Sequence, residues 1–330
     1  MRLALDAMGG DSAPQVVLEG AIEAARADQL PITLLGPEDV LEPLLASYAP
    51  LPPSLELRHA PEVVAMDEHP TVAVREKPNS SIGMGLEMVR LGQADAFVSA
   101  GNTGAIMAYA TLRLGRLSGI ERPAIGTVFP TTSGRSLLLD VGANADSKPS
   151  YLLQFAQMGA AYAQGVLGVA DVRVALLNIG EEPTKGSQLA QEAYRLLQES
   201  GLNFVGNLEG NDLPHGLAEV IVTDGFTGNV VIKTAEGVYE LLMASIRKAL
   251  TSRFHYRLAA ALLRPAFRAV ARDLDYAEYG GAPLLGVKGV VIIAHGRSNA
   301  RAIRRALAVA RQAVESRLLE ALSKATAGQP

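Results

Sequence analysis

Two polar side chains, Lys185 and Asn229, stand where a glycine-rich loop enters a helix, a place suited to chemistry on anions. Backbone N–H groups and the positive end of the helix dipole point out of such a loop, which favours a bound phosphate or a developing oxyanion. Lys185 follows two acidic residues by a few positions and is one of seven lysines beside 23 arginines. Asn229 directly follows Gly228. The simpler interpretations are a solvated lysine and a helix-capping asparagine.

The same arrangement recurs along the chain, because six short apolar runs each end in a loop rich in Gly, Asn or Asp that leads into a helical pattern. Besides Lys185 and Asn229, these loops offer backbone amides, hydroxyls, side-chain amides and an imidazole for contacts with phosphate or substrate. These candidates are Gly9, Gly10, Asp11, Asn102, Thr103, Asn144, Thr227, His295 and Ser298. One such loop can be an ordinary turn between a strand and a helix, but six together predict a binding site.

Known nucleotide-binding and nucleophile motifs do not fit these loops. Residues 83–85 read Gly-Met-Gly without the third glycine of a dinucleotide fingerprint, and in residues 180–187 the lysine and glycine of a P-loop are exchanged. Residues 296–300 lack the last glycine of a nucleophile elbow, so a helix-capping Ser298 is the simpler interpretation. The five histidines are not paired at ligand spacing. We therefore expect neither a metal nor a cofactor.

The elements that position these loops alternate along the chain. The six apolar runs are residues 3–6, 96–100, 136–141, 172–179, 220–223 and 290–294. Strands that alternate with helices predict an α/β protein, with a mostly parallel sheet covered by helices on both faces. Ligands bind beyond the carboxyl ends of parallel strands, so we expect all six loops to gather at one edge of the sheet.

Composition and charge narrow the function classes further. The 330-residue chain has no cysteine, which excludes disulfides, thiolate metal ligands and a cysteine nucleophile. A formal net charge of −4 and the absence of Trp argue against nucleic-acid binding. The N-terminus lacks the pattern of a signal peptide, and no apolar stretch approaches the roughly 20 residues of a membrane span. We expect a cytoplasmic protein, with peripheral contact to a membrane left open.

A basic amphipathic helical protrusion is predicted at about residues 245–275. Seven basic residues and no acidic ones lie between positions 247 and 272. Arg253, Arg257, Arg264 and Arg268 fall on one side of a helical wheel, opposite leucine and phenylalanine side chains. Pro265 is expected to divide the segment into two helices. Such a surface suits an anionic membrane, an acidic carrier protein or the packing of two subunits, and the sequence leaves the three open.

Taken together, the loops resemble one family closely, the bacterial acyl-carrier-protein:phosphate acyltransferases of phospholipid synthesis. The resemblance runs nearly from end to end, and several stretches are six residues or longer. The matching stretches are DAMGGD (6–11), SAGNTGA (99–105), DVGAN (140–144), NIGEEPTKG (178–186), GNLEG (206–210), VTDGFTGN (222–229), GGAPLLG (280–286) and HGRSN (295–299).

The resemblance implies a Rossmann-like, three-layer α/β/α fold related to phosphotransacetylases and to isocitrate and isopropylmalate dehydrogenases. Residues 1–330 would form a single domain with a protruding helical hairpin. The implied partners are acyl carrier protein, inorganic phosphate, a second copy of the chain in a homodimer, and a membrane surface with its glycerol-3-phosphate acyltransferase. In the family, the residues that match Lys185 and Asn229 belong to the active site.

A direct transfer mechanism fits these residues. Phosphate is already an anionic nucleophile at neutral pH, so the reaction needs orientation, desolvation and oxyanion donors more than a strong base. We expect Lys185 and neighbouring amides to hold phosphate, and Asn229 to donate to the thioester carbonyl oxygen. Without cysteine, attack in a ternary complex is simpler than an acyl-enzyme. The alternatives are a phosphotransacetylase-type enzyme that uses acyl-coenzyme A, a dehydrogenase on the same fold, and a non-catalytic membrane-associated scaffold.

Overall fold

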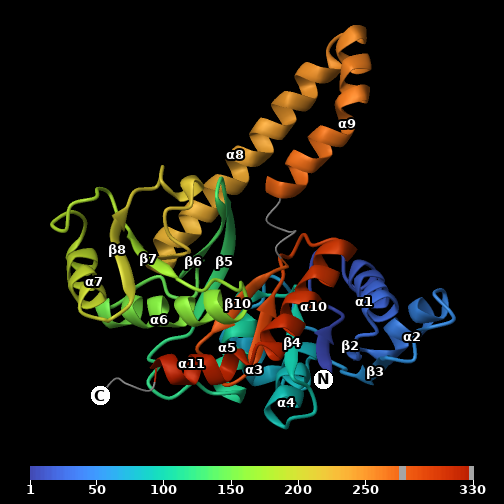
Figure 1. Ribbon diagram of the computed structural model, residues 1–330. Coiled ribbons are helices and arrows are strands. Elements are labelled where there is room, and N and C mark those ends of the chain that lie inside the picture. The colour runs from blue at the N-terminus through green and yellow to red at the C-terminus, as the bar shows by residue number, and fades with distance from the viewer. Residues whose placement is uncertain (275–279, 327–330) are drawn as a thin grey trace.

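The computed structural model describes residues 1–274 and 280–326, except for the side chains of residues 268–269 and 271–274. Strands and helices alternate through most of it (Figure 1). The strands are β1 (Leu3–Asp6), β2 (Ile32–Gly36), β3 (Leu55–His59), β4 (Ala96–Ser99), β5 (Ala124–Thr131), β6 (Gly134–Leu139), β7 (Arg173–Leu177), β8 (Asn203–Leu208), β9 (Val220–Val222), β10 (Ala282–Leu285) and β11 (Val290–Ile293).

The helices fall between and after these strands, and those with more than ten residues cover the sheet or extend beyond it. They are α1 (Gln15–Asp28), α2 (Glu38–Ala46), α3 (Pro70–Glu76), α4 (Ser81–Arg90), α5 (Thr103–Arg113), α6 (Pro149–Gly165), α7 (Gln188–Gln198), the 3₁₀ helix η1 (Leu213–His215), α8 (Gly225–Thr251), α9 (Phe254–Leu274), α10 (Ala300–Glu315) and α11 (Leu318–Thr326).

All described strands join one eleven-stranded sheet, in the order β3-β2-β1-β4-β11-β10-β5-β6-β9-β7-β8. Strand β10 runs antiparallel to both of its neighbours, and β5 runs antiparallel to β6. The remaining neighbouring pairs in the described sheet are parallel. The predicted α/β fold with a mostly parallel sheet is therefore confirmed.

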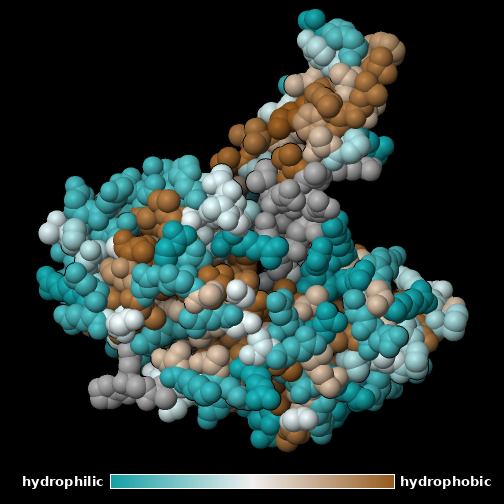
Figure 2. Space-filling model, in the orientation of Figure 1, coloured by the Kyte–Doolittle hydropathy of each residue, from teal (hydrophilic) through white to brown (hydrophobic). Residues whose placement is uncertain are grey.

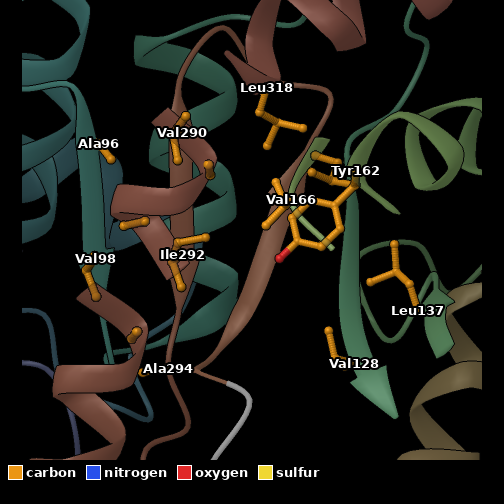
Figure 3. Close-up of a cluster of buried hydrophobic side chains, with 14 of the residues drawn as sticks. Ala96, Val98, Val128, Leu137, Tyr162, Val166, Val290, Ile292, Ala294 and Leu318 are labelled. Carbon is orange, nitrogen blue, oxygen red and sulfur yellow. The ribbon is translucent and has the colours of Figure 1, made fainter. Parts of the chain in front are cut away.

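Helices cover both faces of the sheet because its strands are apolar on both sides. In β1, Leu3 and Leu5 belong to a core that includes residues of α1, α6, α10 and α11. Ala4, between them, faces a second core with residues of α4 and α5. Figure 3 shows part of this first core, with side chains from β11 (Ile292), α6 (Tyr162) and β6 (Leu137). This alternation produces the three-layer α/β/α arrangement.

The expectation that all six loops lie at one edge of the sheet is wrong. Strands β1, β4 and β11 run in one direction, whereas β6, β7 and β9 run in the opposite direction. The reason is that three antiparallel pairs lie between the two sets in the sheet, β11–β10, β10–β5 and β5–β6, and an odd number of reversals leaves the sets in opposite directions. The glycine-rich loops therefore form two groups: a first group after β1, β4 and β11, and a second group after β6, β7 and β9.

Helix α8 connects the two loop groups. It begins directly after β9, and Val231 and Ile232 pack on a core formed by Leu138 of β6 and Ile221 of β9. Two turns into the helix, Lys233 Nζ lies 3.4 Å from His295 Nε2 in the loop after β11. At about 1.5 Å of rise per residue, the start of α8 and Lys233 are separated by roughly 12 Å. The helix thus spans the distance between the second group and the first.

Beyond the sheet, α8 continues outward and pairs with α9 in a protruding helical hairpin (Figure 1). The hairpin turn lies at residues 252–253, so the protrusion includes the outer part of α8 as well as the predicted segment. The expected division at Pro265 is wrong, since α9 runs through this residue. Proline removes one helix hydrogen bond, yet α9 remains helical on both sides of Pro265.

Apolar side chains gather along the hairpin (Figure 2). The arginines Arg253, Arg257 and Arg264 are also exposed there, whereas the side chain of Arg268 lies outside the described residues. The exposed apolar side chains of the hairpin are Val238, Leu241, Leu242, Phe254, Tyr256, Leu258, Leu262, Leu263 and Val270. Within the described part of the chain, no helix has the length and apolarity that crossing a bilayer requires.

A substitution at Gly228, near the start of α8, tests how closely this helix packs against the end of β6. A Cβ atom at Gly228 would overlap the backbone carbonyl oxygen of Asp140. We expect Gly228→Ala to lower the free energy of unfolding by about 1–3 kcal/mol, because the helix must move away from β6. Gly237→Ala, where a Cβ meets open space on the same helix, should raise it by up to about 1 kcal/mol. Urea denaturation measures both, and equal effects would contradict the close packing.

Candidate active site

The first loop group is held together by the carboxylate of Asp6, the last residue of β1. Asp6 accepts hydrogen bonds from the Met8 amide at 3.0 Å and from Ser99 Oγ at 2.7 Å. Burial raises the pKa of Asp6, and the surrounding donors oppose that shift. A Cβ atom at Gly9 would lie 2.5 Å from the Gly101 amide nitrogen. The loop after β1 is therefore pressed against the loop after β4, which leaves room only for glycine.

Asn102, at the start of α5, uses both ends of its side chain within the protein. Its Oδ1 accepts from the Ala105 amide at 3.0 Å and so caps the helix. Its Nδ2 donates to the carbonyl oxygens of Met66 and Glu68, at 3.0 and 2.8 Å. Thr103, the next residue, is exposed. Asn102 thus secures the segment before α3, and its contact with substrate stays a prediction.

His295 lies in the loop after β11, among charged groups from three segments. Its Nδ1 accepts from the Arg297 amide at 3.1 Å, and its Nε2 lies 3.4 Å from Lys233 Nζ. Burial lowers the pKa of His295, and the positive charge of Lys233 lowers it further. Lys233 is itself paired with Glu236 at 2.9 Å, whose side chain is only 9% exposed. These effects favour the neutral imidazole near pH 7.

The same loop is tied to the loop after β1. The Asp11 amide donates to the Gly296 carbonyl at 2.8 Å, so Gly10 and Asp11 lie beside the residues that follow β11. Ser298 is buried, and its amide donates to the His295 carbonyl at 2.9 Å. The helix-capping interpretation of Ser298 is wrong, since Asn299 Oδ1 accepts from the Ala302 amide at 3.0 Å and caps α10.

The second loop group is organised by Asp140, which follows β6 as Asp6 ends β1. Its two carboxylate oxygens accept from the amides of Ile125 at 3.0 Å, Ala143 at 3.1 Å and Asn144 at 2.7 Å. Asn144 Nδ2 also donates to this carboxylate, at 3.0 Å, and to the Pro123 carbonyl at 2.8 Å. Burial raises the pKa of Asp140 despite these donors. Asn144 therefore helps to build the loop.

Asn229 lies in the first turns of α8, with its side chain exposed beside this loop. Its Nδ2 donates to the Val141 carbonyl at 3.2 Å. The capping interpretation of Asn229 is wrong, because Asp224 caps α8 by accepting from the Thr227 amide at 2.9 Å and from Thr227 Oγ1 at 2.7 Å. A primary amide has two N–H donors, so the hydrogen bond to Val141 orients Asn229 and leaves one donor for a ligand.

Lys185 lies in the loop after β7, away from the hydrogen bonds around Asp140 and Asn229. The loop is fixed by Asn178 Nδ2, which donates to the Lys185 carbonyl at 3.1 Å, and by Asn207 Nδ2, which donates to the Glu182 carbonyl at 3.0 Å. The ammonium lies 4.0 Å from Glu182 Oε2, and its side chain is 50% exposed. Among the described residues, Lys185 makes no polar contact with Asn229 or His295.

Four residues that organise the two groups escape the sequence analysis. Asp6 and Asp140 share a recognisable signal, since each follows a leucine at the end of a strand and precedes a glycine-rich loop. Lys233 follows Asn229 by four residues, and Glu236 follows Lys233 by three, so all three can share one helix face. In the portions of the chain that the structure describes, no three His, Asp or Glu side chains are grouped to hold a metal ion.

Solved structures with the same fold include two phosphotransacetylases. A phosphotransacetylase from Streptococcus pyogenes superposes with a TM-score of 0.64 and 18% identity, over 97% of this chain and 94% of the other. The EutD phosphotransacetylase from Staphylococcus aureus gives a TM-score of 0.65 and 16% identity, over 95% and 94%. At these identities the likeness establishes the fold, an α/β/α architecture shared with phosphotransacylases.

The sequence itself is much more similar to another group. The family model described as "Fatty acid synthesis protein" matches residues 1–320, and the chain belongs to this family. The "Phosphate acyltransferase" of Heliobacterium modesticaldum is 53% identical over 330 residues, covering 100% of this chain and 98% of the relative. That of Myxococcus xanthus is 51% identical, covering 100% and 96%. The protein is therefore an acyltransferase.

The loop after β6 depends on an acceptor-only side chain at position 140. In Asp140→Asn, one carboxylate oxygen becomes an NH₂ group that faces the amide of Ile125 or of Asn144. Each buried donor left without an acceptor costs about 1–3 kcal/mol, and we expect a loss of that size or larger in urea denaturation. Asp224→Asn is the matched control, since asparagine caps helices as well as aspartate does. Equal losses in the two variants would contradict this role of Asp140.

Proposed function

We propose that this acyltransferase moves a fatty acyl group from the thioester of acyl carrier protein to inorganic phosphate. The products are an acyl phosphate and free carrier protein, and the acyl phosphate feeds acylation of glycerol-3-phosphate in phospholipid synthesis. Residues 1–330 act as a single domain. The observation that carries the proposal is Asn229, an exposed amide oriented by Val141 at the N-terminal end of a 27-residue helix. Support comes from relatives called phosphate acyltransferase along the full chain.

The chemistry is a direct acyl transfer. A phosphate oxygen attacks the thioester carbon, the carbonyl oxygen becomes an oxyanion, and the C–S bond breaks to release a thiolate. Asn229 and the N-terminal end of α8 stabilise the oxyanion. Lys185 and amides of its loop hold the phosphate, and the flexible four-carbon stem of this half-exposed lysine lets its ammonium follow the ligand. Gly9, Gly10, Asp11 and Thr103 supply further contacts from the first loop group.

A second candidate differs only in the acyl donor. The fold shared with phosphotransacetylases favours a coenzyme A thioester in place of the carrier protein. Turnover of purified protein with matched acyl-carrier and acyl-coenzyme A thioesters separates the two. We expect the carrier thioester to give the higher kcat/KM, and the reverse order would favour the second candidate.

For the hairpin of α8 and α9 we propose contact with an anionic membrane surface from the cytoplasmic side. Exposed arginines beside exposed apolar side chains suit such a surface, at about 1 kcal/mol per cation near the lipid. The same hairpin offers a packing surface for a second subunit in a homodimer and a basic face for the acidic carrier protein. Contact with the membrane brings the acyl phosphate to the glycerol-3-phosphate acyltransferase.

Removal of either proposed active-site side chain tests the mechanism. We expect Lys185→Ala and Asn229→Ala each to lower kcat/KM by about 100- to 1,000-fold, because each removes a donor to charge that develops in the reaction. The assay supplies acyl-carrier thioester and phosphate and traps acyl phosphate with hydroxylamine. Lys324→Ala, an exposed lysine on α11, controls for loss of charge. Near-normal turnover in a folded variant would remove that residue from the mechanism.

Charge reversal on the hairpin tests the membrane contact. The triple variant Arg253→Glu, Arg257→Glu, Arg264→Glu should lose binding to vesicles that contain anionic lipid, because three attractive charges become repulsive. Co-sedimentation with vesicles measures the bound fraction, and neutral vesicles serve as the control. If the variant sediments with anionic vesicles as the wild type does, the hairpin does not hold the membrane through these arginines. Turnover measured without vesicles separates this result from any loss of carrier docking.

A further inference from the structure

The loop between β7 and α7 is held in place by two side-chain amides that bind its carbonyl groups. Asn178, directly after β7, donates from Nδ2 to the Lys185 carbonyl at 3.1 Å. Gln191, near the start of α7, donates from Nε2 to the carbonyls of Thr184 at 2.9 Å and Gly186 at 3.2 Å. Three successive carbonyls of the loop are therefore turned toward the protein.

These contacts fix the directions of two backbone N–H groups. In a planar trans peptide, the C=O of one residue and the N–H of the next point to opposite sides. The Lys185 carbonyl faces Asn178, so the Gly186 N–H points away from Asn178. The Gly186 carbonyl faces Gln191, so the Ser187 N–H points away from Gln191. Among the residues that the structure describes, neither N–H donates to a protein acceptor, and both residues are at least partly exposed.

The orientation of the Asn178 side chain is itself determined by its neighbours. Its Oδ1 accepts from the Ile179 amide at 2.9 Å, while Nδ2 donates to the Lys185 carbonyl. A flipped side chain would place an acceptor against that carbonyl and a donor against that amide, so both hydrogen bonds would be lost. Gly186 has a φ of +87°, and a Cβ atom there would overlap Asn178 Oδ1. The backbone at Gly186 therefore follows the position of Asn178.

Fixed N–H donors supply what the Lys185 ammonium lacks. The stem of Lys185 lies over Gly180, where a Cβ atom would be 3.0 Å from Lys185 Cγ. The side chain is 50% exposed and ends a flexible four-carbon chain, so it attracts an anion without defining the orientation of that anion. Attack on a thioester carbon requires a defined orientation of the phosphate. Backbone N–H groups next to Lys185, held by the contacts described above, provide it.

We propose that Asn178 and Gln191 are positioning residues for the phosphate. Each holds a loop carbonyl toward the protein and thereby aims the N–H of the following residue at the phosphate beside Lys185. The two N–H groups are those of Gly186 and Ser187. This inference rests on the proposed function, which places phosphate at Lys185 and the amides of its loop. Asn178 and Gln191 act through the backbone and do not themselves bind the phosphate.

Removal of a single N–H group tests whether the loop amides bind phosphate. Ser187→Pro deletes the N–H, and the φ of Ser187, −69°, is one that proline adopts without strain. The change also removes the hydroxyl that caps α7 by accepting from the Ala190 amide at 3.3 Å. Ser187→Ala loses the same cap and keeps the N–H, so it is the reference. In calorimetry with inorganic phosphate, we expect Ser187→Pro to bind about 10- to 100-fold more weakly than Ser187→Ala, the effect of one hydrogen bond to a charged group.

Substitution of Gln191 tests the positioning role without changing the backbone. Gln191→Leu removes the donor to the Gly186 carbonyl and adds no charge. We expect the KM for phosphate to rise by about 10-fold or more, with the KM for the acyl thioester unchanged, because only the direction of the loop N–H groups is altered. Gln188→Leu is the matched control on the same helix, since Gln188 donates to Glu192 and not to the loop. Both KM values of this control should equal those of the wild type.

Asn178→Asp tests the other anchor with almost no change in shape. The carboxylate presents an acceptor to the Lys185 carbonyl in place of the Nδ2 donor, so this variant should also raise the KM for phosphate selectively. A purely structural role of Asn178 or Gln191 would instead lower Tm and kcat without separating the two KM values. The affinity for inorganic phosphate, measured by calorimetry, should fall in parallel with the rise in its KM.

Several results would overturn the proposal. Equal phosphate affinity in Ser187→Pro and Ser187→Ala would exclude the N–H as a donor. Unchanged KM for phosphate in Gln191→Leu, or an equal rise in both KM values, would exclude the positioning role, and this test decides the matter if Ser187→Pro does not fold. Calorimetry needs no thioester. A protein that binds phosphate as expected but yields no acyl phosphate would therefore count against the proposed function alone.

Discussion

The close approach of α8 to the end of β6 is the constraint on which the site depends. Gly228 has no side chain, so the helix backbone can rest against the Asp140 carbonyl. From that contact the helix direction is fixed, and with it the position of Asn229 beside Val141 and of Lys233 beside His295. A helix displaced by one side chain's width would separate these pairs. Packing of a single glycine thus sets where the side chains of α8 lie relative to both loop groups.

Two buried carboxylates have equivalent structural roles in the two halves of the sheet. Asp6 and Asp140 each end or follow a strand and gather donors from the loops around them. Burial raises the pKa of both, which means that each carboxylate is held in an environment that penalises its charge. Several short hydrogen bonds offset that penalty. The same hydrogen bonds fix the conformations of the loops. As a result, the glycine amides and side chains of the loops present donors in defined directions.

Local patterns in the sequence predicted six of the eleven described strands, and they did not predict the strand directions. Residues 3–6 form β1 with the predicted bounds, and the other five runs differ by one or two residues at an end. The apolar character of a strand does not encode its direction, and the four-residue β10 carries no signal of its reversal. Contacts across the sheet were equally hidden, since Lys233 and His295 are 62 residues apart. The spacing of Asn229 and Lys233 on one helix was the available clue.

The short antiparallel strand has a mechanical consequence. Ala282 and Pro283 pair with β11, whereas Leu284 and Leu285 pair with β5, so each neighbour of β10 is held by a ladder of only two residues. Elsewhere the ladders are longer, with six pairs between β5 and β6. The two sets of parallel strands are therefore joined across the sheet by these two short ladders and by the apolar core that includes Leu285 of β10.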